Sequence, residues 1–215
     1  MAIVDTGVAA STPQLVPGWD FVDHDSSPAD LNGHGTELAS IVLAQCPTCR
    51  VMPVRVLGRD GTGAIATVVQ GIRYAVAHGA NVINLSLSTS TDNPSLTAAV
   101  EAAVGHGVTV VVAAGNQGLA AAYPGASAPD ALAVGSVTDA GDPFSWSNYG
   151  PWVDLWAPGR LGAESLEGQP TTAVGTSASA AYVSGAAGSL LGCDRTLRPA
   201  GVGSRLRISL SGPFC

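Results

Sequence analysis

Residues 50–87 read RVMPVRVLGRDGTGAIATVVQGIRYAVAHGANVINLSL, and this stretch contains the alternation that decides the fold. Its two apolar runs, Arg50 to Leu57 and Val82 to Leu87, are nearly continuous, as in strands that are covered on both faces of a sheet. Between them, Ala66 to His78 has a helical pattern, and Gly79 follows it in the position of a C-cap. We therefore predict a strand, a helix and a second strand parallel to the first.

The same alternation continues on both sides of this stretch. Further strand-like runs and helical stretches are found at Val108 to Ala113, Ala131 to Val137, Val153 to Trp156, Thr36 to Ala44, Ser95 to His106 and from Ser177 to about Leu191. The sequence has no internal repeat and no low-complexity linker, and its length suits one domain. We predict a single domain, residues 1–215, of the α/β class, with a doubly wound, mostly parallel sheet flanked by helices.

The composition excludes two classes of partner. Charged residues make up 12% of the chain, the net charge is −7, and the positive charge is carried by dispersed arginines without any lysine. Because phosphate binding needs a dense basic patch, we expect no nucleic-acid partner. No run approaches the roughly 18 apolar residues of a membrane span, and no charged segment followed by an apolar one opens the chain, so we expect no membrane partner.

The four cysteines indicate the compartment. Cys46 and Cys49 form a C-x-x-C, while Cys193 and Cys215 bracket the C-terminal segment, and two local disulfides are the simplest pairing. A zinc site is a weaker alternative, because the second pair lacks the close spacing of a metal site. A thioredoxin-like redox site is also disfavoured, since its C-x-x-C opens a helix whereas this one follows a helix. Disulfides predict a secreted or extracytoplasmic protein.

Four residues form a candidate catalytic group. A serine hydroxyl needs a base to take its proton, a carboxylate to orient that base, and donors for the oxyanion. Ser177 begins a predicted helix, while Asp5 and Asn116 follow apolar strands, where the functional groups of such folds gather. We assign Ser177 as nucleophile, His34 as base, Asp5 as orienting acid, and Asn116 with the Ser177 backbone N–H as oxyanion donors.

Each of these segments also has a purely structural interpretation. Asp5-Thr6-Gly7 is typical of a turn, His34 could be a helix N-cap, and Gly175-Thr176-Ser177 is common at helix starts. Their occurrence together on an α/β pattern favours the catalytic interpretation. His24, His78 and His106 receive no catalytic role, since the last two lie near helix C-termini and His24 lies in an acidic loop.

In their order along the chain, these motifs resemble those of the subtilisin-like serine proteases. The matching segments span essentially the whole chain: Asp5-Thr6-Gly7, Asn32-Gly33-His34-Gly35-Thr36, Asn81-Val82-Ile83-Asn84-Leu85-Ser86-Leu87, Ala113-Ala114-Gly115-Asn116, Tyr123-Pro124-Gly125, Trp156-Ala157-Pro158-Gly159 and Gly175-Thr176-Ser177. The resemblance implies a subtilisin-like catalytic domain, a serine endopeptidase that hydrolyses peptide bonds through an acyl-enzyme and requires no cofactor for its chemistry.

The resemblance also implies how a substrate binds. An extended peptide or protein segment would add as a strand between Thr62-Gly63-Ala64 and Ser86-Leu87-Ser88. The P1 side chain would enter a pocket walled by Ala113, Ala114 and Gly115 and floored near Ala122, and the P4 side chain would contact Ile65 and Leu87. All of these are uncharged, which predicts broad specificity with apolar or medium P1 side chains. An ordinary core role is the alternative for Ile65 and Leu87.

An acidic loop precedes the histidine segment. It contains Asp20, Asp23, Asp25, Ser27 and Asp30, and hard oxygen ligands at this density suit calcium. The spacing of Asp20, Asp23, Asp25 and Ser27 resembles a calcium loop of thermitase-type members of the family, which implies a structural calcium ion. A solvated acidic turn is the alternative, and both stay open.

Several features depart from the family. The chain begins four residues before Asp5, and the family's usual C-terminal helix is not evident after Arg205 to Leu210, so both ends look trimmed. Whether a propeptide or second chain completes the fold stays open. A family calcium-binding insertion is replaced by Cys46-Pro47-Thr48-Cys49, where a disulfide could take over its constraint. Ser88-Thr89 occupies a position that is usually rich in glycine, which narrows the expected P1 rim.

Two further departures lie beside the catalytic residues. Glu37 stands where the family often has a histidine, one helical turn from His34, and it either stabilises the imidazolium or faces solvent. Ala181, within Ala178 to Tyr182, stands where the family has a proline, which restores a backbone donor. A peptide ligase or macrocyclase is therefore one alternative function, and a catalytically silent peptide-binding scaffold is another.

Overall fold

The computed structural model describes residues 1–87, 89, 93–123 and 125–209. Its centre is a seven-stranded sheet in the order β2-β3-β1-β4-β5-β6-β7, in which every pairing is parallel. The strands are β1 (Ala2–Asp5), β2 (Trp19–Asp20), β3 (Met52–Arg55), β4 (Val82–Leu85), β5 (Thr109–Ala113), β6 (Leu132–Val137) and β7 (Leu155–Pro158). The predicted α/β class with a mostly parallel sheet is therefore confirmed.

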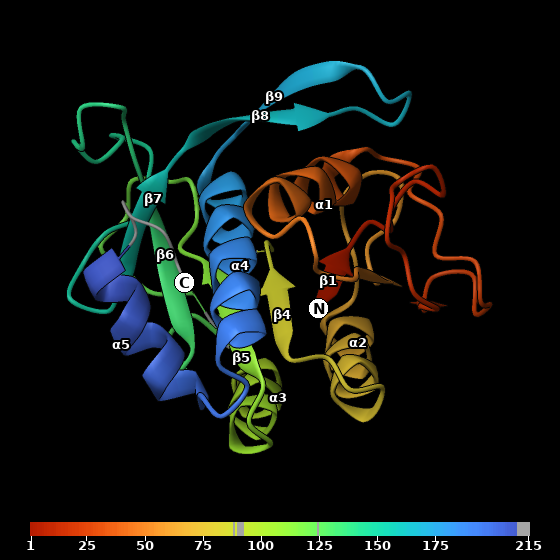
Figure 1. Ribbon diagram of the computed structural model, residues 1–215, viewed down its shortest axis with the longest axis horizontal. Coiled ribbons are helices and arrows are strands. Elements are labelled where there is room, and N and C mark those ends of the chain that lie inside the picture. The colour runs from red at the N-terminus through yellow and green to blue at the C-terminus, as the bar shows by residue number, and fades with distance from the viewer. Residues whose placement is uncertain (88, 90–92, 124, 210–215) are drawn as a thin grey trace.

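Helices cover both faces of this sheet (Figure 1). Helices α1 (His34–Gln45), α4 (Thr176–Cys193) and α5 (Pro199–Ser209) lie on one face, and α2 (Ile65–Ala77) and α3 (Pro94–Gly105) lie on the other. An antiparallel hairpin, β8 (Arg160–Glu164) and β9 (Pro170–Val174), leads into α4.

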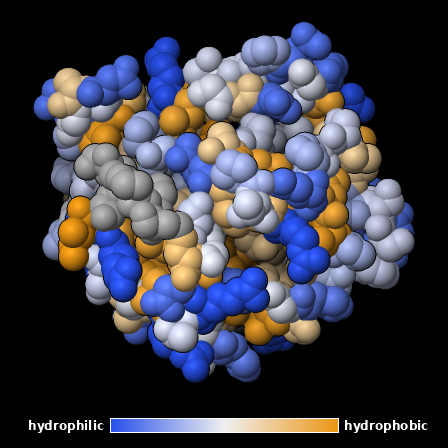
Figure 2. Space-filling view, viewed as in Figure 1, coloured by the Kyte–Doolittle hydropathy of each residue, from blue (hydrophilic) through white to orange (hydrophobic). Residues whose placement is uncertain are grey.

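The two-sided cover explains the continuous apolar runs. Successive strand residues point to opposite faces, so Val82 and Val111 pack in the cluster beneath α4 and α5, while Ile83 and Val110 pack against α2 and α3. All four are fully buried or nearly so. Hydrophilic and hydrophobic residues are interspersed on the face shown in Figure 2, as expected for a chain with few charges.

Several elements differ from the sequence expectation, and the short strand β2 and the hairpin β8–β9 were not predicted. The run Arg50 to Leu57 contributes only Met52–Arg55 to the sheet, and β7 begins two residues later than predicted. No pattern in the sequence predicts α5, because Gly201 and Gly203 lower its helix propensity. Gly203 is nevertheless suited to its place, since an added Cβ there would lie 2.8 Å from a Leu132 side-chain atom. The residues after Ser209 lie outside the described part of the chain.

A short disulfide follows α1. Cys46 and Cys49 are bonded, with a Cα–Cα distance of 5.3 Å, as predicted. The disulfide packs against α4, because a Cβ added at Gly188 would lie 2.6 Å from the Cys49 sulfur. The predicted Cys193–Cys215 pairing involves a residue outside the described part of the chain. Within that part, none of the helices is both long and apolar enough to cross a membrane.

Candidate active site

The candidate catalytic residues approach one another at the carboxyl edge of the sheet. Asp5 ends β1, Ser86 follows the adjacent strand β4, and Asn116 follows β5, while His34 and Ser177 lie in the first turns of α1 and α4. The strand order therefore brings together residues that are up to 172 positions apart in the sequence, between Asp5 and Ser177.

Asp5 and His34 form a direct pair. The Nδ1 atom of His34 lies 2.7 Å from Oδ1 of Asp5, which is fully buried and also accepts the backbone N–H of Thr6 at 2.8 Å. Burial lowers the pKa of His34, but the charge and hydrogen bond of Asp5, with the charges of Glu37 and Asp30, outweigh it and raise that pKa above its ordinary value. The pair therefore favours a protonated, oriented imidazole.

The loop before His34 is organised by Asp30. Its Oδ1 accepts the backbone N–H groups of Asn32 and Gly33 at 2.9 Å, and its Oδ2 accepts the N–H and hydroxyl of Thr36 at 2.9 and 2.6 Å. Gly33 has a φ of 111°, which favours glycine. A Cβ at Gly35 would lie 2.1 Å from the carbonyl oxygen of Gly7, which requires the second glycine. Asp30, placed in the acidic loop by its sequence position, is thus a buried organiser of the histidine segment.

Ser177 contacts the end of β4. Its hydroxyl donates to the carbonyl oxygen of Ser86 at 3.4 Å, and the Ser86 hydroxyl donates to the Ser177 carbonyl oxygen at 3.2 Å. The hydrogen bonds among the described residues include none between Ser177 and His34. The bond from the Ser177 hydroxyl to the Ser86 carbonyl oxygen is long for an O–H···O hydrogen bond, so little opposes rotation of this hydroxyl.

Asn116 is oriented by Thr176, a residue of the Gly175-Thr176-Ser177 motif for which no role was predicted. The Oδ1 atom of Asn116 accepts the Thr176 backbone N–H at 2.9 Å and its hydroxyl at 3.0 Å. The same hydroxyl oxygen accepts the N–H of Gly115 at 3.0 Å. Because the amide oxygen is engaged on this side, the N–H groups of Asn116 remain available as donors. The position of Thr176 directly before Ser177 was the available sequence signal.

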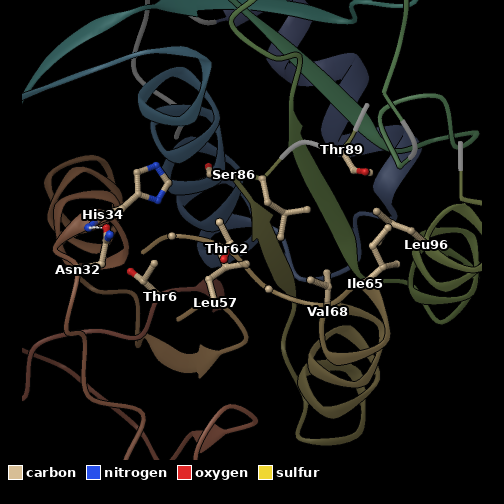
Figure 3. Close-up of a pocket in the computed structure, with 13 residues that line it drawn as sticks. Thr6, Asn32, His34, Leu57, Thr62, Ile65, Val68, Ser86, Thr89 and Leu96 are labelled. Atoms are coloured by element: carbon tan, nitrogen blue, oxygen red, sulfur yellow. Dashed lines mark hydrogen bonds between the residues drawn. The ribbon is translucent and has the colours of Figure 1, made fainter. Parts of the chain in front are cut away.

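A cavity of about 460 Å³ extends from His34 (Figure 3). One end is polar, with His34 and Ser86, and the other end is apolar, with Ile65, Val68 and Leu96. Among the predicted substrate-binding residues, Thr62, Gly63, Ile65, Ser86 and Leu87 line it, whereas Ala64 precedes α2 beside them. Thr89, which was expected at the P1 rim, also lines this cavity. The other lining residues had no predicted substrate contact: Thr6, Asn32, Leu57, Gly61, Val68 and Leu96.

The predicted P1 wall lies apart from this cavity. Ala113 and Ala114 are buried, and Ala113 packs in the core cluster beneath α4. Gly115 lies beside Asn148, whose backbone N–H donates to the Gly115 carbonyl oxygen at 2.9 Å. None of these residues, nor half-buried Ala122, lines the 460 Å³ cavity, so their P1 role stays a prediction. Ser88 lies outside the described residues.

Two carboxylates of the acidic loop pair with an arginine. Oδ2 of Asp20 and Oδ2 of Asp23 accept from Nη1 of Arg55 at 2.6 and 2.5 Å. Oδ1 of Asp25 instead accepts the backbone N–H of Ser27 at 2.7 Å. The described residues contain no group of three or more His, Cys, Asp or Glu arranged to hold a metal ion. The calcium role of Asp20, Asp23, Asp25 and Ser27 therefore stays a prediction.

Glu37 is coupled to His34 electrostatically. It is half-buried on the first turn of α1. Burial raises the pKa of Glu37, and Asp30 adds to this, while the charge of His34 opposes it. The charge of Glu37 is one cause of the raised pKa of His34, and both alternatives for Glu37 stay open.

Comparison with known proteins agrees with this geometry. The sequence model of the subtilase family matches residues 1–205. The chain is 39% identical over 202 residues to the thermophilic serine proteinase of Bacillus sp. (strain AK1), covering 87% of this chain and 50% of that protein. It is also 39% identical over 211 residues to thermitase of Thermoactinomyces vulgaris, covering 91% of this chain and 76% of thermitase.

A solved structure has the same fold. The crystal structure of a cold adapted subtilisin-like serine proteinase superposes with a TM-score of 0.92 at 32% identity, covering 96% of this chain and 80% of that one. The family match, the relatives and the shared fold have one explanation: this chain belongs to the subtilase family, which includes serine proteinases such as those relatives.

Proposed function

We propose that this chain is a serine endopeptidase that hydrolyses peptide bonds through an acyl-enzyme. The observation that carries the proposal is the 2.7 Å Asp5–His34 pair at the same sheet edge as Ser177 and Asn116. In this reaction Asp5 accepts the Nδ1–H of His34, which leaves Nε2 free to take the proton of the Ser177 hydroxyl. Before attack, that hydroxyl turns from the carbonyl oxygen of Ser86 toward the imidazole.

The oxyanion is stabilised by two donors. The Ser177 oxygen attacks the substrate carbonyl, and the negative charge that develops meets the Asn116 amide N–H and the Ser177 backbone N–H at the start of α4. His34 then gives its proton to the leaving amine, and a water molecule activated by the same imidazole releases the acyl group. Thr176 supports this step by fixing the amide oxygen of Asn116.

The substrate is an extended peptide. Among the described residues, Thr62 to Ala64, Ser86 and Leu87 provide the main-chain partners, and the apolar end of the cavity takes a side chain distant from the scissile bond. The Cys46–Cys49 disulfide supports an oxidising compartment, so we propose that the enzyme acts outside the cytoplasm. No cofactor takes part in these steps.

Steady-state cleavage of a chromogenic peptide tests the proposal. We expect Ser177→Ala and His34→Ala to abolish measurable turnover, and Asn116→Ala to lower kcat by about 10²–10³ with little change in KM. Ser204→Ala, an exposed serine of α5, is the matched control and should cleave like the wild type. Retained turnover in folded Ser177→Ala would contradict the assignment, and ligated peptide in place of cleaved peptide would favour the ligase alternative.

A further inference from the structure

A buried arginine lies where the acidic loop meets the sheet. Arg55 ends β3 in register with Asp20 of β2, and their exposed fractions are 4% and 1%. The Nη1 atom of Arg55 lies 2.6 Å from Oδ2 of Asp20 and also contacts Oδ2 of Asp23. The two carboxylates with the spacing of a calcium loop thus already share one positive charge.

Two further carboxylate oxygen atoms of the loop accept backbone N–H groups. Oδ1 of Asp20 accepts the backbone N–H groups of Val22 and Asp23 at 2.7 and 2.9 Å, and Oδ1 of Asp25 accepts that of Ser27. Calcium requires six to eight oxygen ligands at about 2.3–2.6 Å. An ion at these carboxylates would compete with the backbone donors and would lie beside a buried guanidinium of like charge. Four of the six carboxylate oxygen atoms of Asp20, Asp23 and Asp25 are thus already bonded within the protein, which disfavours calcium at this loop.

The guanidinium meets both carboxylates through Nη1, while its Nε is buried without a hydrogen-bond partner among the described residues. It is planar, remains charged and has several donors, whereas a buried carboxylate without a partner is strongly unfavourable. Burial lowers the pKa of Arg55, but its hydrogen bonds and ion pairs with Asp20 and Asp23 outweigh this and raise the pKa. Asp20 and Asp23 are therefore held by an internal cation, which is neither of the two alternatives considered from the sequence.

We propose that Arg55 is the resident cation of the acidic loop and that the loop is stabilised by this internal ion pair without calcium. The same loop continues to Asp30, which organises the histidine segment, so Arg55 stabilises one end of the segment that positions His34. This proposal concerns stability and cation binding, and it holds whether or not the chain is a peptidase.

Thermal unfolding with millimolar calcium and with a chelator tests the proposal. The response to calcium is compared between the wild type and Asp23→Asn, a variant expected to fold because the Asp23 side chain is 59% exposed. The proposal predicts the same calcium response in both proteins. A Tm gain with calcium that disappears in Asp23→Asn would show a loop that binds calcium, and would overturn the proposal.

A second experiment replaces Arg55 and measures thermal unfolding. Arg55→Met should lower Tm by about 10 °C, because breaking a buried pair leaves Asp20 unpaired. Arg207→Met is the matched control, since Arg207 pairs with Asp154 at 2.6 Å but is 48% exposed, and should lower Tm by about 3 °C or less. Equal losses in the two variants would overturn the role of Arg55. If Arg55→Met does not fold, Arg55→Lys is measured in its place. Lysine keeps the positive charge, so Arg55→Lys should lower Tm by less than the shift of about 10 °C expected for Arg55→Met.

Discussion

Single side chains at the active site act through their neighbours as much as through their own chemistry. Thr176 bonds both Asn116 and Gly115, and so connects the start of α4 to the end of β5. Asp5 is fixed by burial and by the Thr6 N–H, which gives His34 a stationary partner. Glu37 adds charge without a hydrogen bond to the ring. These residues supply the orientation that the nucleophile and base require.

Thr176→Val should lower kcat and leave KM nearly unchanged. The substitution preserves shape but removes the hydroxyl that fixes the Asn116 amide, so part of the oxyanion stabilisation is lost. We expect a loss of about tenfold, less than that of removing the amide itself. Steady-state kinetics measure it, with Thr176→Ser, which keeps the hydroxyl, as a control close to wild type. A change confined to KM would indicate a binding role instead.

Glu37→Gln should move the acid limb of the kcat/KM profile to lower pH. The catalytic imidazole must be unprotonated, and its raised pKa places the rise in activity above the ordinary histidine value. Removing the Glu37 charge removes one cause of that increase, so the pKa of His34 should fall. A profile between about pH 5 and 9 measures it. If the acid limb of Glu37→Gln stays at the wild-type pH, Glu37 does not influence the imidazole and only faces solvent.

The elements show where sequence patterns succeed and where they do not. The runs around Val82, Val110 and Val134 predicted core strands, because strands buried on both faces are apolar at every position. Helix α5 was not predictable by propensity, since tertiary packing of Val202 and Leu206 overrides its two glycines.

The residues of the candidate site were also only partly predictable from the sequence. Asp5, His34, Ser177 and Asn116 were identified because their motifs follow strand ends and helix starts. The roles of Asp30 and Arg55 were not, because one depends on side-chain bonds to loop N–H groups and the other on a pairing across 35 sequence positions. Neither leaves a periodic pattern in the sequence.

Asp30→Ala should destabilise the protein by about 3 kcal/mol. The change removes four hydrogen bonds and leaves N–H groups of the α1 start without partners. Denaturant unfolding should show a lower midpoint with an unchanged slope. Asp25→Ala removes one solvent-exposed hydrogen bond in the same loop and should lower the free energy of unfolding by about 1 kcal/mol or less. An equal decrease in the free energy of unfolding in the two variants would contradict the role of Asp30 in organising the histidine segment.

At the scale of the molecule, two helices carry the reacting groups and pack against each other. α1 provides His34 and α4 provides Ser177, and the two form an extensive contact across the apolar cluster that includes Leu38, Val42 and Ala181. The Cys46–Cys49 disulfide directly follows α1 and packs against Gly188 of α4. The relative position of base and nucleophile therefore depends on this helix pair.

Removing the disulfide should lower Tm while retaining activity. Closing so short a loop accounts for about 2 kcal/mol, which corresponds to roughly 4–8 °C in a domain of this size. Calorimetry of Cys46→Ala/Cys49→Ala measures the shift, and alanine suits the buried Cys46 site. Loss of activity in a sample that remains folded would mean that the disulfide positions the reacting groups directly.

Covalent labelling of the nucleophile tests the central claim most directly. The folded protein is incubated with a fluorophosphonate, which reacts with serines activated by a base, and the modified residue is located by peptide mass analysis. The account predicts one adduct, on Ser177, which is absent in Ser177→Ala and forms far more slowly in His34→Ala. A folded sample that remains unlabelled, or that is labelled on another serine, would contradict it.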